Sequence, residues 1–173
     1  MCISDGLALV LVAAFFVLRV PDTDAGAMYA KYGTPPSQML GIDRTRRVHV
    51  RDEGPRDAPV VILLHGSNAD LHTWQAWADA LKSDYRVIRF DQRGHGLTGP
   101  AAAGDYALVA FVTDIDAVAD PLNVQPLTPP AHSLAVAIAL GYAIAHPDRS
   151  PALFLVLAAA PSVPPDLVGT PPV

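Results

Sequence analysis

The stretch VVILLHG at residues 60–66 is the most informative part of this 173-residue chain. About 25 residues further on, YRVIRFDQRGHG at residues 85–96 has the same form: an apolar, β-branched run ends abruptly in a polar turn that contains glycine. Between the two runs, residues 74–81 have the apolar spacing of a helix. The three segments predict a strand–helix–strand unit, and the unbroken apolar runs predict parallel strands buried on both faces.

Apolar patterns on either side of this unit continue the alternation of strands and helices. Residues 39–43 and 46–52 predict two short antiparallel strands, because apolar and polar side chains alternate in the second of them. Helices are expected at residues 111–122 and 134–145, and a further buried strand at residues 152–159. This order of elements predicts an α/β fold with a mostly parallel sheet and helices on both faces.

The two polar turns carry a resemblance to a known family. His65 and Gly66, at the end of the first buried strand, resemble the HG loop of α/β-hydrolases, and residues 91–96 resemble the D-x-R-G-x-G loop of the same family. The similarity covers residues 39–160 and implies the α/β-hydrolase fold. It also implies that the HG glycine lets the backbone approach a developing oxyanion, with the N–H of Ser67 as donor. A plain strand-to-helix turn is the alternative.

In that family the D-x-R-G-x-G loop shapes the wall of the pocket and takes no part in the chemistry. The resemblance therefore implies a structural role for the residues of both turns, namely His65, Gly66, Asp91, Arg93, Gly94, His95 and Gly96. Residues 94–99 also fit the dinucleotide-binding pattern G-x-G-x-x-G. However, Pro100 follows where that motif needs the N-terminus of a helix, so we expect no nucleotide there.

Residues 131–136, AHSLAV, lie where the resemblance places the nucleophile elbow, a tight strand-to-helix turn flanked by small residues. Ser133 is thereby the candidate nucleophile, and the backbone N–H of Leu134 is the second candidate oxyanion donor. Two features oppose this interpretation. Val136 places a β-branched side chain where the helix presses on the sheet, and the prolines of residues 125–130 are unfavourable in a central strand. Ser133 is thus either a working nucleophile or a serine that merely occupies the turn.

The other two members of a catalytic triad follow the serine in this fold, first the acid and then the histidine. After Ser133 the chain has the acids Asp148 and Asp166 and a single histidine, His146. His146 lies 13 residues further on, about 20 Å away along the same helix at 1.5 Å per residue, so it cannot take the proton of the hydroxyl. We therefore expect a hydrolase fold that is incomplete at its C-terminus, after the sixth strand.

The parent activity that the resemblance implies is serine-dependent hydrolysis of a small apolar ester or related acyl substrate. Without the acid and the histidine, we expect activity to be absent or slight unless a second chain supplies them. Two alternatives stay open: a non-catalytic remnant, and a membrane-tethered binding module that holds an apolar ester or acid without turnover. The apolar strand at residues 153–157 is expected to leave an exposed sheet edge at which association occurs.

An apolar run of 13 residues, Gly6 to Leu18, sets the N-terminus apart. It fits the core of a signal peptide or a short membrane anchor, so we expect export or membrane association through residues 6–20. A buried N-terminal helix in a cytoplasmic protein is the alternative. The organisation that we expect is a signal or anchor at residues 1–27, a linker at 28–38, the hydrolase domain at 39–160 and a proline-rich tail at 161–173.

Composition excludes several classes of function. The formal net charge is −5 and no strong basic patch stands out, so we expect no nucleic-acid partner. The single cysteine, Cys2, excludes an internal disulfide and a cysteine-based zinc site. We expect neither a metal nor a cofactor.

Overall fold

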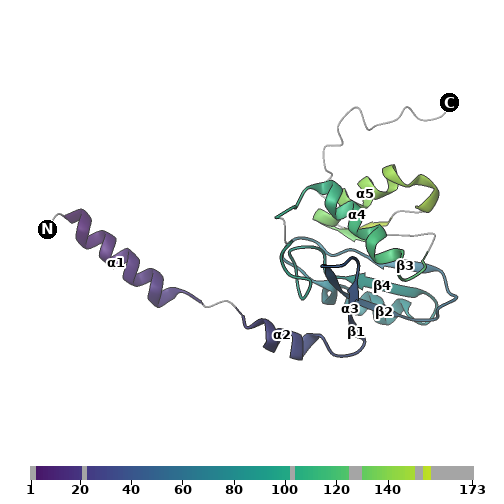
Figure 1. Ribbon diagram of the computed structural model, residues 1–173, viewed down its shortest axis with the longest axis horizontal. Coiled ribbons are helices and arrows are strands. Elements are labelled where there is room, and N and C mark those ends of the chain that lie inside the picture. The colour runs from purple at the N-terminus through teal and green to yellow at the C-terminus, as the bar shows by residue number, and fades with distance from the viewer. Residues whose placement is uncertain (1–2, 21–22, 102–103, 125–129, 151–153, 157–173) are drawn as a thin grey trace.

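The computed structural model of the chain describes residues 3–20, 23–101, 104–124, 130–150 and 154–156. Figure 1 shows a body that contains the strands, with the helix α1 standing apart from it. The elements are, in chain order, α1 (Ile3–Leu18), α2 (Ala25–Tyr32), β1 (Ser37–Gly41), β2 (Arg47–Glu53), β3 (Val60–Leu63), η1 (Leu71–Trp74), α3 (Gln75–Leu81), β4 (Arg86–Phe90), α4 (Leu108–Ala119), β5 (Pro130–His132), α5 (Leu134–Ala145), η2 (Pro147–Arg149) and β6 (Phe154–Val156).

The strands form two hydrogen-bonded groups that a single bridge joins. Four strands lie in the order β1-β2-β4-β3, β5 pairs with β6, and the bridge between Leu64 and Ala131 brings β5 next to β3. The β1–β2 and β2–β4 pairs are antiparallel, whereas β3–β4, β5–β6 and the bridge are parallel. The expected α/β fold with a mostly parallel sheet is confirmed, and so is the antiparallel pair at its start.

The buried strands divide their side chains between two apolar layers, because successive side chains of a strand point to opposite faces. In β3, Ile62 belongs to the cluster beneath α4 and α5, whereas Val61 and Leu63 belong to a second cluster with Trp74 of η1. Helical elements therefore cover both faces of the sheet, as expected (Figure 1). Each such aliphatic side chain contributes about 1.5–3 kcal/mol to folding by leaving water.

One strand is more deeply buried than its sequence indicates. The alternation in β2 predicted one solvated face, but Val48, His49 and Val50 are all buried. The second face is covered here because His72 of η1 lies against His49, with ring centroids 6.2 Å apart. His49 is therefore an interior residue, which the sequence pattern did not show.

The segment predicted to be a linker, residues 28–38, is mostly regular structure. α2 continues to Tyr32, and β1 begins at Ser37. The side chain of Asp24 accepts a hydrogen bond of 2.7 Å from the N–H of Ala27, and this cap starts the helix within the stretch assigned to a signal or anchor. The assignment of residues 28–38 as a linker between domains stays a prediction, and these residues contain the end of α2 and the start of β1.

Other expected elements agree with the structure or lie beyond what it describes. α5 has the expected bounds, and α4 begins at Leu108, three residues before its predicted start. Of the strand expected at residues 152–159, β6 is described. The prolines at 126 and 129 and the tail at 161–173 lie outside the described residues.

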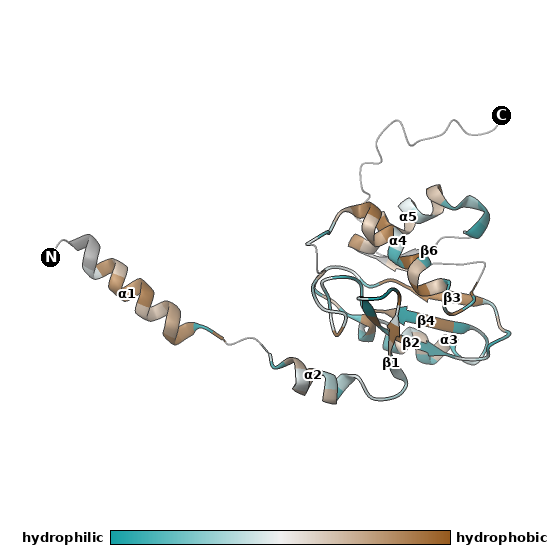
Figure 2. Ribbon diagram, in the orientation of Figure 1, coloured by the Kyte–Doolittle hydropathy of each residue, from teal (hydrophilic) through white to brown (hydrophobic). Residues whose placement is uncertain are grey.

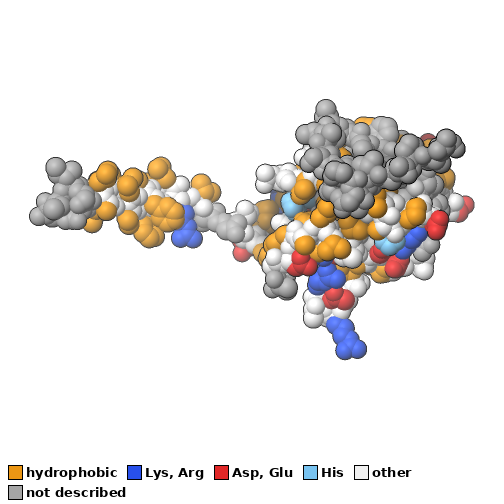
Figure 3. Space-filling model, turned by 90° about the horizontal axis from the view of Figure 1, so that it is seen from above, with side chains coloured by type: hydrophobic (Ala, Val, Ile, Leu, Met, Phe, Trp, Pro, Cys, Tyr) orange, Lys and Arg blue, Asp and Glu red, His pale blue; other side chains and the backbone are white. Residues whose placement is uncertain are grey.

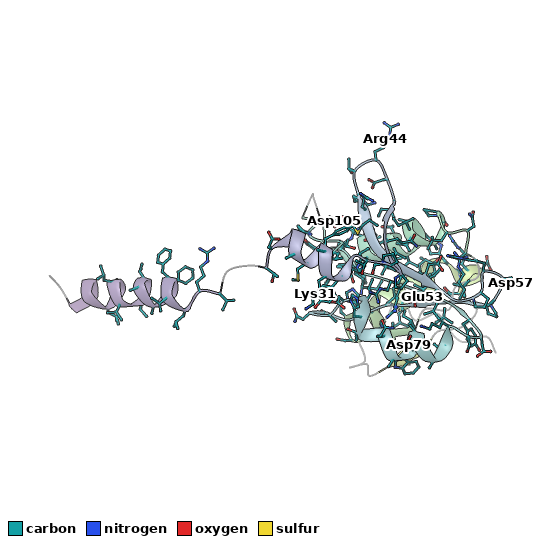
Figure 4. All side chains as sticks on the ribbon, turned by 90° about the horizontal axis from the view of Figure 1, so that it is seen from below. Lys31, Arg44, Glu53, Asp57, Asp79 and Asp105 are labelled. Carbon is teal, nitrogen blue, oxygen red and sulfur yellow. The ribbon has the colours of Figure 1, made fainter. Side chains whose placement is uncertain are left out.

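The cluster of arginines between β1 and β2 does not form a free basic patch. Figure 4 shows Arg44 at the outer tip of this hairpin, pointing away from the body. The carboxylate of Asp43 accepts hydrogen bonds of 2.8 Å from the N–H groups of Thr45 and Arg46, which holds the turn. Arg46 also contacts Asp114 of α4 at 3.1 Å, so its charge is compensated.

Residues 6–18 of α1 carry only apolar side chains, and most of these are exposed to solvent. Leu9, Val17 and Leu18 are 74%, 82% and 77% exposed. Figures 2 and 3 show hydrophobic residues along the length of the helix, away from the sheet. The helix is not buried in this structure, and the choice between a signal, an anchor and an N-terminal helix of a cytoplasmic protein stays a prediction. Among the described residues, no helix combines the length and apolar character needed to cross a membrane.

Candidate active site

The HG turn and the candidate nucleophile leave neighbouring strands at the same edge of the sheet. Leu64 and Ala131 face each other across the parallel bridge. Gly66 follows Leu64 by two residues, and Ser133 follows Ala131 by two residues. Because the two strands run in the same direction, this register brings the HG turn and Ser133 to one place.

Ser133 has a backbone conformation that residues other than glycine seldom adopt. Its φ is 58° and its ψ is −122°. Such a conformation costs on the order of 1–3 kcal/mol and persists only where the surroundings impose it. The neighbours Ala131 and Ala135 are fully buried, so larger side chains at these positions would collide with the core. The turn is therefore tight and strained, and it points an exposed serine outward.

The simplest alternative for a serine before a helix is an N-cap, and the geometry opposes it. A capping serine has an extended backbone, and its hydroxyl accepts a bond from the first turn of the helix. Ser133 has a positive φ, and its side chain makes no capping hydrogen bond. Val136, which was expected to disturb the packing, is 1% exposed and belongs to the main core cluster. The helix thus accommodates a β-branched residue at this position.

His65 ties the turn after β3 to the turn after β4. Its Nε2 accepts a hydrogen bond of 3.0 Å from the N–H of Gln92, so its Nδ1 carries the proton and donates to the carbonyl of Gly66 at 2.8 Å. The ring is fully buried, and burial lowers the pKa of His65. Both nitrogens of a neutral ring are thus engaged in holding backbone, which leaves neither to act as a general base.

Asp91 is the hub of the turn after β4. Its carboxylate accepts hydrogen bonds from the Nδ1–H of His49 at 2.7 Å and from the N–H groups of Leu71 and Leu97 at 2.8 Å each. Burial raises the pKa of Asp91, but these hydrogen bonds outweigh it and hold the pKa below its usual range. A Cβ on Gly96 would lie 2.0 Å from the same carboxylate, so only glycine fits there.

Arg93 fastens this turn to α4. Its guanidinium donates two hydrogen bonds of 2.7 Å to the carboxylate of Asp114, a bidentate pair that is largely buried. Gly94 has a φ of 81°, and a Cβ there would lie 2.7 Å from the ring of Tyr106. His95 contacts the carbonyl of Arg93 through Nδ1 at 3.0 Å. The contacts of this loop, both within it and to α4, thus fix its shape.

His146 lies at the far end of α5 and is engaged there. Its Nε2 is 3.2 Å from a carboxylate oxygen of Asp116 in α4, and Arg149 contacts the same carboxylate at 2.7 Å. The ring of Tyr142 packs against it, and the hydroxyl of Tyr142 donates to Asp116 at 2.8 Å. This group holds α5 to α4, one helix length from Ser133.

Comparison with known proteins assigns the chain to a family. Residues 59–170 match the family described as alpha/beta hydrolase fold, and this match covers well over half of the chain. The chain therefore belongs to the α/β-hydrolase family, as the HG and D-x-R-G-x-G turns indicated.

Individual relatives differ in their chemistry. The magnesium-chelatase 30 kDa subunit of Rhodobacter capsulatus is 38% identical over 98 residues, which are 57% of this chain and 34% of that protein. Epoxide hydrolase 4 of Homo sapiens is 31% identical over 122 residues, 70% of this chain and 34% of that protein. The thioesterase domain from the curacin biosynthetic pathway superposes with a TM-score of 0.64 at 29% identity, covering 73% of this chain and 48% of that one. The chain thus spans a third to a half of the length of these relatives.

Proposed function

We propose that this chain carries the nucleophile and the oxyanion donors of a serine hydrolase that acts on an ester or related acyl substrate. In this proposal Ser133 attacks the carbonyl carbon, and the backbone N–H groups of Ser67 and Leu134 stabilise the oxyanion that develops. The observation that carries the proposal is the strained backbone of Ser133, which a capping or merely structural serine would not need.

The identity of the nucleophile narrows the reaction. A serine hydroxyl forms an acyl-enzyme with esters and thioesters as their alcohol or thiol leaves. Water then hydrolyses that intermediate, which releases the acid and returns the free enzyme. Members of the family that open epoxides use an aspartate at this position. The serine therefore favours acyl chemistry for this chain, although a relative named as an epoxide hydrolase matches it.

Deprotonation of Ser133 needs a base that neither His65 nor His146 supplies. His65 uses both ring nitrogens to hold backbone, and His146 is paired with Asp116 at the other end of α5. An unassisted hydroxyl is a poor nucleophile at neutral pH. We therefore expect residues 1–173 alone to have at most slight activity, with a histidine and its acid contributed from elsewhere.

Chemical rescue tests this proposal, because imidazole in solution can replace a missing histidine. The chain is mixed with p-nitrophenyl butyrate and imidazole, and acylation is followed by the intact mass and by peptide mapping. We expect one butyryl adduct on Ser133 that depends on imidazole. Ser133→Ala should abolish the adduct, whereas Ser83→Ala, a change at an exposed serine beyond α3, should retain it. An adduct that persists in Ser133→Ala would show that this serine is not the nucleophile.

We propose further that α1 attaches the chain to a lipid surface. The helix has 16 residues, about 24 Å at 1.5 Å per residue, which is less than the ~30 Å of a bilayer core. Its exposed leucine, valine and phenylalanine side chains would leave water on insertion. Flotation with phosphatidylcholine vesicles tests this: the chain should float, and replacement of Phe15 and Phe16 by glutamate should release it. Equal flotation of the two proteins would contradict the proposal.

A further inference from the structure

A small pocket with two histidines lies where β2, η1 and α2 meet. Its volume is about 130 Å³, and its lining includes Tyr32, His49, Asp70, His72 and Asp91. We call it the histidine pocket. None of the proposed nucleophile and oxyanion groups lines it, so it is a separate feature of the molecule.

Both histidines use one ring nitrogen in the same way. The Nδ1 of His49 lies 2.7 Å from Asp91, and both side chains are 1% exposed. The Nδ1 of His72 lies 3.1 Å from Asp70. Because an ionised carboxylate only accepts hydrogen bonds, each Nδ1 carries the proton, and each Nε2 is left with a lone pair.

The two Nε2 atoms are buried and have no hydrogen-bond partner among the described residues. A buried acceptor without a partner costs about 1–3 kcal/mol, so the two neighbouring lone pairs favour binding of a group that pairs with them. The ring centroids of His49 and His72 are 6.2 Å apart, so both rings belong to one site. A hydrogen-bond donor or a metal ion is the kind of group that pairs with such lone pairs.

A metal-bound histidine almost always donates its other ring N–H to a carboxylate or a carbonyl, and that partner orients the ring. His49 with Asp91 and His72 with Asp70 both have this arrangement. We propose that the histidine pocket binds a divalent transition-metal ion of the zinc type through the Nε2 atoms of His49 and His72. Imidazole nitrogen suits zinc, copper and nickel better than it suits calcium or magnesium.

The charges around the pocket are compatible with a cation. Asp70 and Asp91 supply negative charge, while Arg51 is the opposing cation near His72. A metal ligand must be a neutral imidazole, and in the tautomer that donates Nδ1–H to Asp70 the Nε2 of His72 has the lone pair that such a bond needs. No group of three or more histidine, cysteine, aspartate or glutamate side chains gathers in a metal-binding arrangement within the described residues. The two imidazoles would thus be the protein ligands of the ion, with water in its other positions.

A bound metal ion would link the strand β2 to the short helix η1. His49 belongs to β2, and His72 belongs to η1, which follows the turn that begins with His65. An ion shared by the two rings would hold η1 against β2 and so fix the far end of the loop that carries Ser67. Metal binding should accordingly raise the thermal stability of the chain by mass action.

Zinc binding to the full chain, first freed of metal with a chelator, tests the proposal. Zn²⁺ is titrated against a chromophoric chelator, and the ¹⁵N resonances of the histidine rings are recorded. We expect one equivalent of zinc, with shifts confined to the Nε2 signals of His49 and His72. His72→Ala should abolish binding, and Asp70→Asn should weaken it on the order of 10- to 100-fold through loss of the ring's carboxylate partner.

The matched control is His146→Ala, which removes a histidine that lies at the end of α5 and pairs with Asp116. This variant should bind zinc as the unmodified chain does. Circular dichroism establishes that each variant is folded. Zinc affinity that is the same in the unmodified chain and in folded His72→Ala would overturn the proposal. Absence of zinc binding at millimolar concentration would overturn it as well.

Discussion

The turn after β4 and the turn after β5 leave the same edge of the sheet, but they are held in opposite ways. In the first, the carboxylate of Asp91 accepts hydrogen bonds from His49, Leu71 and Leu97. The left-handed position at Gly96 is filled by the residue for which it costs least. The buried side chain of Asp91 thus anchors the backbone of this turn to its neighbours.

The turn after β5 has a serine where the first has glycine. Ser133 keeps a positive φ, and its hydroxyl makes no capping bond to α5. Backbone strain and the pairing of polar side chains therefore distinguish these two turns, which leave the same edge of the sheet. The turn after β4 has glycine at its left-handed positions and pairs the carboxylate of Asp91, whereas the turn proposed to be reactive retains strain and exposes Ser133.

The largest effect is expected at the hub of the turn after β4. Asp91→Ala leaves His49, Leu71 and Leu97 without their acceptor, and we expect a loss of about 3–5 kcal/mol in the free energy of unfolding. Urea titration followed by circular dichroism measures it. The exposed Asp84→Ala should change the same quantity by less than about 0.5 kcal/mol. A loss below about 1 kcal/mol for Asp91→Ala would show that the carboxylate is not the hub.

The next largest loss in the free energy of unfolding is expected at Gly96. Comparison with Gly99 distinguishes a steric clash from the cost of a positive φ. At Gly96 a Cβ would lie 2.0 Å from Asp91, whereas at Gly99, which also has a positive φ, no atom lies within 4 Å of the added Cβ. We expect Gly96→Ala to cost about 2–3 kcal/mol and Gly99→Ala only the conformational cost of about 1–2 kcal/mol. Urea midpoints of the two variants give the comparison. Equal losses would mean that the carboxylate moves aside without cost.

Acid should weaken the turn after β4 by a smaller amount, because protonation removes the charge of Asp91 but leaves its oxygens in place. The folded-state pKa of Asp91 lies below its usual value, so its contribution is present above the ordinary pKa of about 4 and is lost as the pH falls further. Unfolding by urea at pH 7 and at pH 3 measures this. Asp91→Asn should show a shallower acid loss than the unmodified chain. If the unmodified chain and Asp91→Asn lost the same free energy of unfolding between pH 7 and pH 3, other carboxylates would account for the acid sensitivity.

The smallest change in the free energy of unfolding, a gain in stability, is expected at the turn of Ser133, which we propose to be reactive. Ser133→Gly removes the conformational strain and should stabilise the chain by up to about 1 kcal/mol, while it abolishes acylation. Ser133→Ala also abolishes acylation but keeps the strain, so it should bring no such gain. Thermal unfolding of the two variants measures the difference. An alanine variant as stable as the glycine variant would show that the turn holds no strain.

Much of the fold could be predicted because runs of consecutive apolar residues indicate buried strands. The runs at residues 60–64 and 85–90 predicted β3 and β4, and the alanine-rich stretch before Pro147 predicted α5. α2 was missed because Gly33 and the nearby prolines suggested a linker, although Asp24 is a capping residue three positions before Ala27. The order of the strands in the sheet could not be predicted from local sequence patterns, because the pairing of β2 with β4 joins residues more than 30 positions apart.

The candidate site could be predicted in position but not in conformation. The family pattern placed Ser133 at the strand-to-helix turn, yet its positive φ follows from how β5 and α5 pack rather than from the identity of the residue. The His49–Asp91 pair was missed, because His49 stands between two valines and resembles a solvated position. The only signal in the sequence was a histidine in a strand otherwise expected to pack against the core.

The position of β4 between β2 and β3 affects how the protein is made. β4 is the last of these four strands to leave the ribosome, but it provides the inner pairing edge for both neighbours. Until Phe90 has emerged, the β1–β2 hairpin and β3 each have an unpaired edge and apolar side chains in water. The order β1-β2-β4-β3 is therefore completed only when β4 is available, and the apolar edges exposed before that step favour association.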